Sequence, residues 1–213
     1  APPAEILAAY IIGAEVAAIG CSPDGRNINK GCGALDTQAM RREVVRRRFD
    51  CGVSLDGDAD RAIFADETGA LCEGDLVIGV AAVDLDRRGL LHGRKVALTV
   101  MSNFGLIEFL KSQGIGSVCV PVGDRNVTEA IEAGRLSLGG ENSGHIIFRR
   151  FSPTGDGLLT ALGLPSLAYG LTTASSLGWK HISVLGPIIA GLLVLAGFVW
   201  REGRTKAPLV PLF

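Results

Sequence analysis

Short apolar runs alternate with amphipathic segments along the chain from Pro3 to Ala161. This alternation is typical of an α/β protein, in which strands and helices follow one another. Strands are predicted over residues 15–20, 52–55, 61–65, 95–100 and 116–122. Helices are predicted over residues 4–12, 37–49, 76–88, 104–113 and 126–133. A second α/β unit is predicted to begin near Cys72, because the alternation resumes there.

The helix predicted over residues 37–49 has two unlike faces. Apolar side chains recur on one face at helical spacing, at Met40, Val44, Val45 and Phe49. The other face is mostly arginine, at Arg41, Arg42, Arg46, Arg47 and Arg48. The apolar stripe favours a solvated helix over a basic binding patch. Residues 66–69 (Asp-Glu-Thr-Gly) predict a tight turn that closes a hairpin.

After residue 162 the pattern changes. Residues 182–200 are 19 residues without a charge, with Trp179 and Trp200 near the ends and charged side chains beyond them. Length, flanking charge and tryptophans predict a membrane-spanning helix. A buried core helix is the alternative.

Composition limits the function classes further. A net charge of -1 excludes a strongly basic nucleic-acid binder, although the part before residue 162 carries about -4 and the tail about +3. The five cysteines are odd in number and widely spaced, which indicates free thiols in a reducing compartment.

The densest chemistry lies at residues 56–60, which read Asp-Gly-Asp-Ala-Asp and are followed by Arg61. Alternate side chains of an extended stretch project to one side, so Asp56, Asp58 and Asp60 can converge on a cation. Like charges this close raise one another's pKa unless a cation lies among them. Oxygen ligands without nearby His or Cys favour magnesium, with manganese or calcium as rivals.

Two other interpretations of this loop are open. A calcium loop of the EF-hand type also begins Asp-x-Asp-x-Asp and would place Glu67 at its twelfth position. Arg61 at its sixth position and the predicted flanking strands argue against it. The other alternative is a solvated acidic turn between two strands.

Three further loops combine glycine with polar side chains. Residues 139–145 read Gly-Gly-Glu-Asn-Ser-Gly-His, in which Glu141, Ser143 and His145 could bind the hydroxyls of a polyol, although a plain turn looks similar. Gly123, Asp124 and Arg125 precede a predicted helix, as do residues 154–157. Loops at helix N-termini are natural anion sites, and Arg125 could hold a phosphate, although either loop could equally be a helix cap.

Taken in order, these motifs resemble those of bacterial phosphoglucosamine mutases of the α-D-phosphohexomutase superfamily, over about residues 3–162. The matching segments are 23–33 (Pro-Asp-Gly onward), 55–61, 100–103, 122–125, 140–148 and 154–161. The resemblance implies an α/β fold: an incomplete second domain and a third domain, each a mixed sheet flanked by helices, followed by an apolar helical tail. The expected boundaries are residues 1–71, 72–162 and 163–213.

The resemblance also implies a function. Such isomerases interconvert glucosamine 6-phosphate and glucosamine 1-phosphate in the cytoplasm, through a phosphoserine. Asp56, Asp58 and Asp60 would bind Mg²⁺, with Arg61 in a supporting catalytic role. Glu141, Ser143 and His145 would select the sugar, and residues 123–125 (Gly-Asp-Arg) would add to the substrate site.

The chain departs from that family in three ways. No serine lies in a motif matching the phosphoserine, the fourth domain is missing, and Asn126 stands where an aromatic residue is usual. We therefore expect no mutase turnover from this polypeptide alone. The tail after residue 163 resembles a fragment of a major facilitator drug exporter, so a transporter fragment with a soluble α/β extension is the alternative, with membrane contact through residues 182–200.

Overall fold

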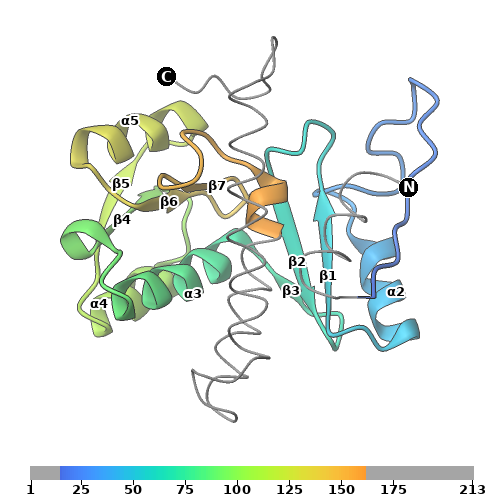
Figure 1. Ribbon diagram of the computed structural model, residues 1–213, viewed down its shortest axis with the longest axis horizontal. Helices are drawn as coiled ribbons and strands as arrows, with labels where there is room; N and C mark the ends of the chain where they lie inside the picture. Colours follow the sequence, from blue (N-terminus) through green and yellow to red (C-terminus); the bar gives the residue numbers. More distant parts are fainter. Residues whose placement is uncertain (1–14, 162–213) are drawn as a thin grey trace. The chain divides into compact units, whose positions relative to one another are not determined.

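The computed structural model describes residues 15–161 (Figure 1). The helix predicted over residues 4–12, the apolar tail and its candidate membrane-spanning segment at 182–200 all lie outside that range. Residues Ser22–Ala161 form one compact unit. Among the helices within the described range, none is long and apolar enough to cross a bilayer.

The first sheet has three strands in the order β1-β2-β3: β1 (Cys51–Leu55), β2 (Ala62–Asp66) and β3 (Leu71–Cys72). Both strand pairs are antiparallel within the described residues, whereas the family resemblance implied a mixed sheet for this domain. The reason is that short turns connect consecutive strands, and a short turn can only reverse the chain. Helix α2 (Gln38–Arg47) covers this sheet, where Met40 and Val44 pack with Ala65.

The second sheet has four strands in the order β5-β4-β6-β7: β4 (Lys95–Thr99), β5 (Gly116–Val120), β6 (Leu138–Gly140) and β7 (Ile146–Phe148). Strand β4 runs parallel to β5 and β6, while β7 is antiparallel to β6, so this sheet is mixed as predicted. Because β4, β5 and β6 run the same way, the loops that follow them lie at one edge of the sheet.

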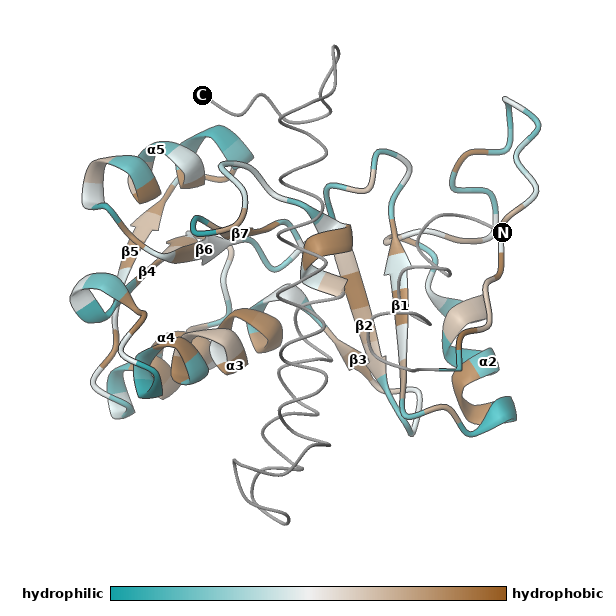
Figure 2. Ribbon diagram, viewed as in Figure 1, coloured by the Kyte–Doolittle hydropathy of each residue, from teal (hydrophilic) through white to brown (hydrophobic). Residues whose placement is uncertain are grey.

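Three helices cover the second sheet: α3 (Gly74–Arg87), α4 (Phe104–Ser112) and α5 (Asp124–Gly134). Helix α5 lies on one face, and α3 and α4 lie on the other (Figure 1). Beneath α5, Val127 and Ile131 pack against Ala97 and Ile147. Hydrophobic residues concentrate on the strands and the inner helix faces, and hydrophilic ones on the outer faces (Figure 2). The α/β class and the helix-covered sheets are therefore confirmed.

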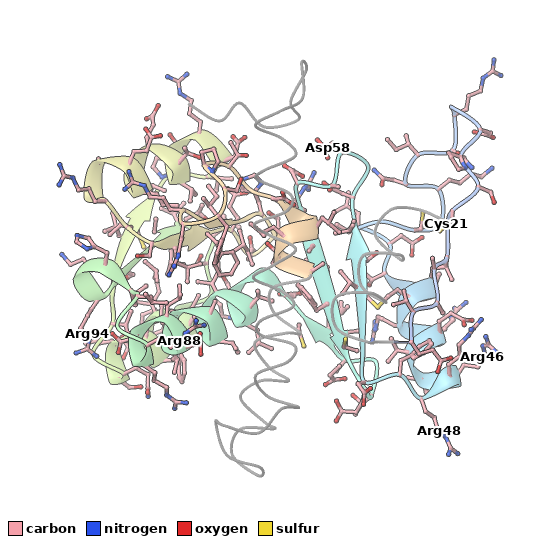
Figure 3. The ribbon with its side chains drawn as sticks, viewed as in Figure 1. Cys21, Arg46, Arg48, Asp58, Arg88 and Arg94 are labelled. Carbon is pink, nitrogen blue, oxygen red and sulfur yellow. The ribbon has the colours of Figure 1, made fainter. Side chains whose placement is uncertain are left out.

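Most predicted elements form, with ends shifted by a few residues. The strand predicted over residues 15–20 is wrong: these residues are largely exposed and have no strand partner among those described. Apolar alternation alone does not make a strand, because the ladder of backbone hydrogen bonds needs a neighbour. The arginines of α2 are exposed, as predicted, and Arg46 and Arg48 project outward in Figure 3.

Candidate functional site

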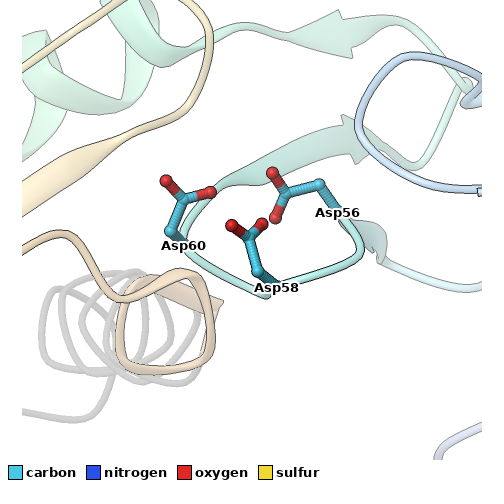
Figure 4. Close-up of side chains that lie close together, drawn as sticks. All are labelled: Asp56, Asp58 and Asp60. Atoms are coloured by element: carbon cyan, nitrogen blue, oxygen red, sulfur yellow. The ribbon is translucent and has the colours of Figure 1, made fainter. Parts of the chain in front are cut away.

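The acidic loop joins β1 to β2 and gathers its three carboxylates. One oxygen from each of Asp56, Asp58 and Asp60 lies within 4.8 Å of the others. Figure 4 shows the three side chains turned toward a common space. The loop closes through the Ala59 N–H, which donates to the Asp56 carbonyl at 3.2 Å. Flanking strands in place of helices exclude the EF-hand arrangement.

Arg61 lies against this cluster. Its Nε atom is 2.7 Å from Asp56 Oδ2 and 3.3 Å from Asp60 Oδ1, and its backbone N–H donates to Asp56 Oδ1 at 3.2 Å. The approach to Asp56 Oδ2 is a charge contact outside hydrogen-bond geometry, so this buried oxygen has no hydrogen-bond donor within residues 15–161. A hard cation bound by carboxylate oxygens would satisfy it, so the residues present fit a divalent metal.

Two of the carboxylates have opposite pKa shifts. Burial raises the pKa of Asp56, but the neighbouring Asp60 carboxyl and the N–H and charge of Arg61 outweigh burial, so that pKa is lowered. The pKa of Asp60 is raised by burial and then by the neighbouring Asp56, which the contact with His145 only partly offsets. As an interacting pair they titrate together, with the negative charge held first on Asp56.

The loop between β6 and β7 meets the acidic loop through His145. This side chain is buried, and its Nδ1 atom lies 3.1 Å from Asp60 Oδ2. The backbone contributes as well: Arg61 and His145 form an isolated antiparallel bridge, and the Ala62 N–H donates to the Gly144 carbonyl at 3.1 Å. Two motifs that the sequence separates by some eighty residues therefore form one site.

Two other side chains of the β6–β7 loop, Glu141 and Ser143, form hydrogen bonds with protein groups. Glu141 Oε1 accepts the Gly123 N–H at 2.8 Å, and Ser143 Oγ donates to Glu141 Oε2 at 3.3 Å. The loop after β5 is thereby joined to the same site. Within it, Asp124 Oδ1 accepts the Arg125 N–H at 2.6 Å. The Arg125 guanidinium is exposed and pairs with Glu129 at 2.7 Å along α5.

The structure also brings in the segment 154–157, for which the sequence predicted an anion site or cap at a helix start but no contact with the acidic loop. The Gly157 N–H donates to the Ala59 carbonyl at 2.9 Å, inside the acidic loop. Gly155 lies so close to the His145 imidazole that a Cβ atom there would collide with the ring. In the sequence, the two glycines of Thr-Gly-Asp-Gly could have indicated that this segment packs closely against another part of the chain, because glycine permits such close approach.

Comparisons with known proteins agree on one family. The family model described as phosphoglucomutase/phosphomannomutase, alpha/beta/alpha domain III, matches residues 73–177. A phosphoglucosamine mutase of Rhodospirillum rubrum is 50% identical over 151 residues, which cover 71% of this chain and 33% of that protein. One from Chlamydia felis is 44% identical over 149 residues, covering 70% and 32%. The chain thus spans about a third of the length of these curated relatives.

Solved structures with the same fold are more distant in sequence. A phosphoglucomutase/phosphomannomutase family protein from Burkholderia thailandensis superposes with a TM-score of 0.58 at 22% identity, covering 66% of this chain and 30% of that one. The phosphoglucomutase parafusin from Paramecium gives 0.55 at 17% identity, covering 75% and 28%. At this identity the likeness establishes the fold alone.

Proposed function

The chain belongs to the phosphoglucomutase/phosphomannomutase family, and from that membership we propose that it is part of a phosphoglucosamine mutase, which interconverts glucosamine 6-phosphate and glucosamine 1-phosphate. The observation that carries the proposal is the 3.1 Å contact between His145 and Asp60. It joins a carboxylate cluster suited to a metal with a loop rich in hydrogen-bonding groups. The metal would suit the phosphate group of a sugar phosphate, and the hydrogen-bonding groups would suit its sugar ring.

In this proposal Asp56, Asp58 and Asp60 hold Mg²⁺, which supplies positive charge to the oxygens of a phosphoryl group during transfer. The orphaned Oδ2 of Asp56 and the 4.8 Å cluster support that assignment. Arg61 offsets part of the negative charge of the cluster before a metal binds: after burial has raised the pKa of Asp56, Asp60 and then the N–H and charge of Arg61 lower it. Its guanidinium is partly exposed and could also face the phosphate.

The β6–β7 loop is proposed to bind the hexosamine. Glu141 and Ser143 offer carboxylate and hydroxyl oxygens that suit ring hydroxyl and amino groups. Their mutual hydrogen bond and the one from Gly123 orient them before a ligand arrives. Arg125 is proposed to reach a phosphate by exchanging its exposed pairing with Glu129.

We propose that catalysis needs residues other than those named above, because no serine in this sequence lies in a motif that matches the family's phosphoserine. The polypeptide is therefore expected to bind Mg²⁺ and sugar phosphate without turnover. The transporter alternative rests on residues 163–213, outside the described part, and no observation on residues 15–161 favours it.

Titration calorimetry with magnesium chloride tests the proposal. The wild-type chain should release or absorb heat that disappears when Asp56, Asp58 and Asp60 are all changed to Asn. Asp86→Asn is the matched control, because Asp86 is a surface carboxylate that pairs with Arg94 at 2.8 Å. Equal heats from the wild type and the triple variant would refute the metal site. Glucosamine 1-phosphate accumulating from glucosamine 6-phosphate, magnesium and a bisphosphate activator would refute the expected lack of turnover.

A further inference from the structure

Residues 27–33 (Asn-Ile-Asn-Lys-Gly-Cys-Gly) precede α2 and have no role in the proposed function. Both ends of this segment are held by hydrogen bonds. At its start, Asp24 Oδ1 accepts the Asn27 N–H at 2.9 Å. At its end, the Gly33 carbonyl accepts the buried hydroxyl of Ser54 at 2.8 Å. Because Ser54 lies on β1 just before the acidic loop, the segment is anchored beside that loop.

The tip of the 27–33 segment lies against the acidic loop. A Cβ atom on Gly57 would lie 2.5 Å from Ile28 Cδ1 and 3.2 Å from Asn29 Nδ2. At these distances the two side chains are in contact with the backbone of Gly57. The rest of the Ile28 side chain is in solvent, since the residue is 71% exposed. Ile28 therefore covers one part of the acidic loop instead of filling a core.

Asn29 joins this contact to the anchored end of the segment. Its backbone is left-handed, with φ of 57°, a conformation that asparagine adopts more readily than most residues. A Cβ atom on Gly33 would lie 2.7 Å from Asn29 Oδ1, so the Asn29 side chain touches both Gly33 and Gly57. A continuous series of contacts thus runs from Ser54 on β1 through Gly33 and Asn29 to the acidic loop.

Space, and not backbone conformation, requires glycine at position 57. Gly57 is not among the residues with a positive φ, so alanine could adopt the same conformation. The atoms that a side chain at this position would meet first belong to Ile28 and Asn29. The residue that is tolerated at position 57 therefore depends on the residue at position 28.

The tip of the acidic loop has little other support. The loop is held at Ala59, whose N–H donates to the Asp56 carbonyl and whose carbonyl accepts the Gly157 N–H. In the described part of the chain, neither Gly57 nor Asp58 takes part in a backbone–backbone hydrogen bond. Asp58 is also the most exposed of the three carboxylates. A contact that limits movement at Gly57 therefore limits the position of the Asp58 carboxylate.

We propose that Ile28 and Asn29 are positioning residues that hold Gly57, and with it Asp58, in the arrangement that binds a divalent cation. A loop that is restrained before binding loses less conformational freedom when the cation arrives, so it binds the cation more tightly. The effect on cation binding rests on the proposed function, in which Asp58 is a metal ligand. The restraint of the acidic loop by Ile28 does not depend on that function.

Titration calorimetry with magnesium chloride is the first test. Ile28→Ala should weaken magnesium binding about fivefold, the effect expected when one more group must be ordered on binding. Its melting temperature should fall by less than about 3 °C, because the side chain is mostly exposed. Ile28→Val should recover most of the affinity. Leu35→Ala is the control, since Leu35 also precedes α2 and is 90% exposed. Wild-type affinity in Ile28→Ala would overturn the proposal.

A pair of substitutions tests the contact directly. Gly57→Ala should weaken magnesium binding about tenfold, because the added methyl group meets Ile28 and displaces the loop. When Ile28→Ala is added, the methyl group has room, and the affinity should return to within about twofold of Ile28→Ala alone. Adding Leu35→Ala to Gly57→Ala should restore nothing. Equal affinities of Gly57→Ala with and without Ile28→Ala would overturn the proposal.

Amide hydrogen exchange followed by NMR in the metal-free protein separates this inference from the proposed function. The Ala59 N–H, which donates to the Asp56 carbonyl within the loop, should exchange about fivefold faster in Ile28→Ala and at the wild-type rate in Leu35→Ala. If the wild type does not bind magnesium, the proposed function fails, while faster exchange at Ala59 would still support the restraint by Ile28. Unchanged exchange at Ala59 in Ile28→Ala would overturn it.

Discussion

Glu141 Oε1 accepts a hydrogen bond from the Gly123 backbone N–H at 2.8 Å, so a side chain expected to face a sugar also anchors the loop after β5. Its second oxygen accepts from Ser143 at 3.3 Å. Both oxygens thus have protein partners, and a ligand hydroxyl must share or replace one of them. The Ser143 contact, being the longer, is the one that a ligand would displace more readily.

Replacing Glu141 separates its two roles. Glu141→Gln retains an oxygen that can accept from Gly123 and should lower the free energy of unfolding by less than about 1 kcal/mol. Glu141→Ala leaves that N–H without its acceptor and should cost about 1–3 kcal/mol. Urea unfolding measures both. Equal losses would mean that the carboxylate charge matters more than the hydrogen bond.

His145→Phe should weaken magnesium binding about tenfold or more while the chain stays folded. Phenylalanine fills the buried ring site but cannot contact Asp60, and a metal-binding carboxylate that loses such support typically loses affinity to this extent. Calorimetry measures the change. His92→Phe, on an exposed 3₁₀ turn, is the control and should bind like the wild type. Unaltered affinity in His145→Phe would show that Asp60 is oriented by other groups.

Arg61→Gln should lower the melting temperature without magnesium and increase the stabilisation that magnesium gives. Without the guanidinium, the repulsion among the three carboxylates is no longer offset by a protein cation. Because Arg61 is partly exposed, we expect an effect of about 1 kcal/mol at most, or about 2–4 °C. Thermal unfolding with and without magnesium chloride measures it, with Arg94→Gln as the control for loss of a surface ion pair. A smaller magnesium shift in Arg61→Gln would contradict the assignment.

Gly74→Ala should destabilise the protein by about 2 kcal/mol or more, because the added methyl group collides with the backbone of the β6–β7 loop. Gly79→Ala lies in the same helix, but its methyl group would be close to the end of the Leu106 side chain, at 3.1 Å, and at ordinary contact distance from the Phe109 ring. It should change stability by less than about 1 kcal/mol, since alanine also favours the helix. Similar losses in the two variants would indicate that any methyl group on α3 is tolerated equally badly.

Asp66 gives the hairpin turn a pH dependence. Its Oδ1 atom accepts from the Thr68 hydroxyl at 2.7 Å and from the Thr68 and Ala70 N–H groups, each at 2.9 Å. The Thr68 side chain and then the Ala70 N–H hold the pKa of this carboxyl below its ordinary value. The carboxylate therefore stabilises the fold above the ordinary pKa of aspartate, and this contribution is lost as the pH falls through the lowered one.

Asp66→Asn should accordingly be less stable than the wild type at neutral pH, with a difference that shrinks as the pH falls below about 4. Urea unfolding at a series of pH values measures it. Asp36→Asn, an exposed carboxylate with one long contact of 3.4 Å, is the control. If the free energy of unfolding of Asp66→Asn differed from that of the wild type by the same amount at every pH, the ionised form of Asp66 would not be the source of the stabilisation.

The parts of the fold that the sequence predicts are those with strong periodicity. Helix α2 follows from the spacing of Met40 and Val44, and the Asp66–Gly69 turn follows from its residue types. Strand β6 escaped detection, because two of its three residues are glycines and carry no side-chain pattern. Its backbone is nevertheless held between β4 and β7.

The candidate site was predictable in its parts but not in its assembly. The convergence of Asp56, Asp58 and Asp60 was predicted correctly, but a tight turn with a left-handed Ala59 brings them together rather than an extended stretch. The contact of His145 with Asp60 depends on pairing between distant segments, which no local pattern encodes.

Ala59 adopts a left-handed backbone conformation, with φ of 59°. For a residue with a Cβ atom this geometry is disfavoured by about 1–2 kcal/mol, so the surrounding fold must enforce it. The loop's shape is then set when the protein folds, so the proposed metal ion would find the three carboxylates already in place. Ala59→Gly would remove this conformational cost and broaden the range of shapes open to the loop.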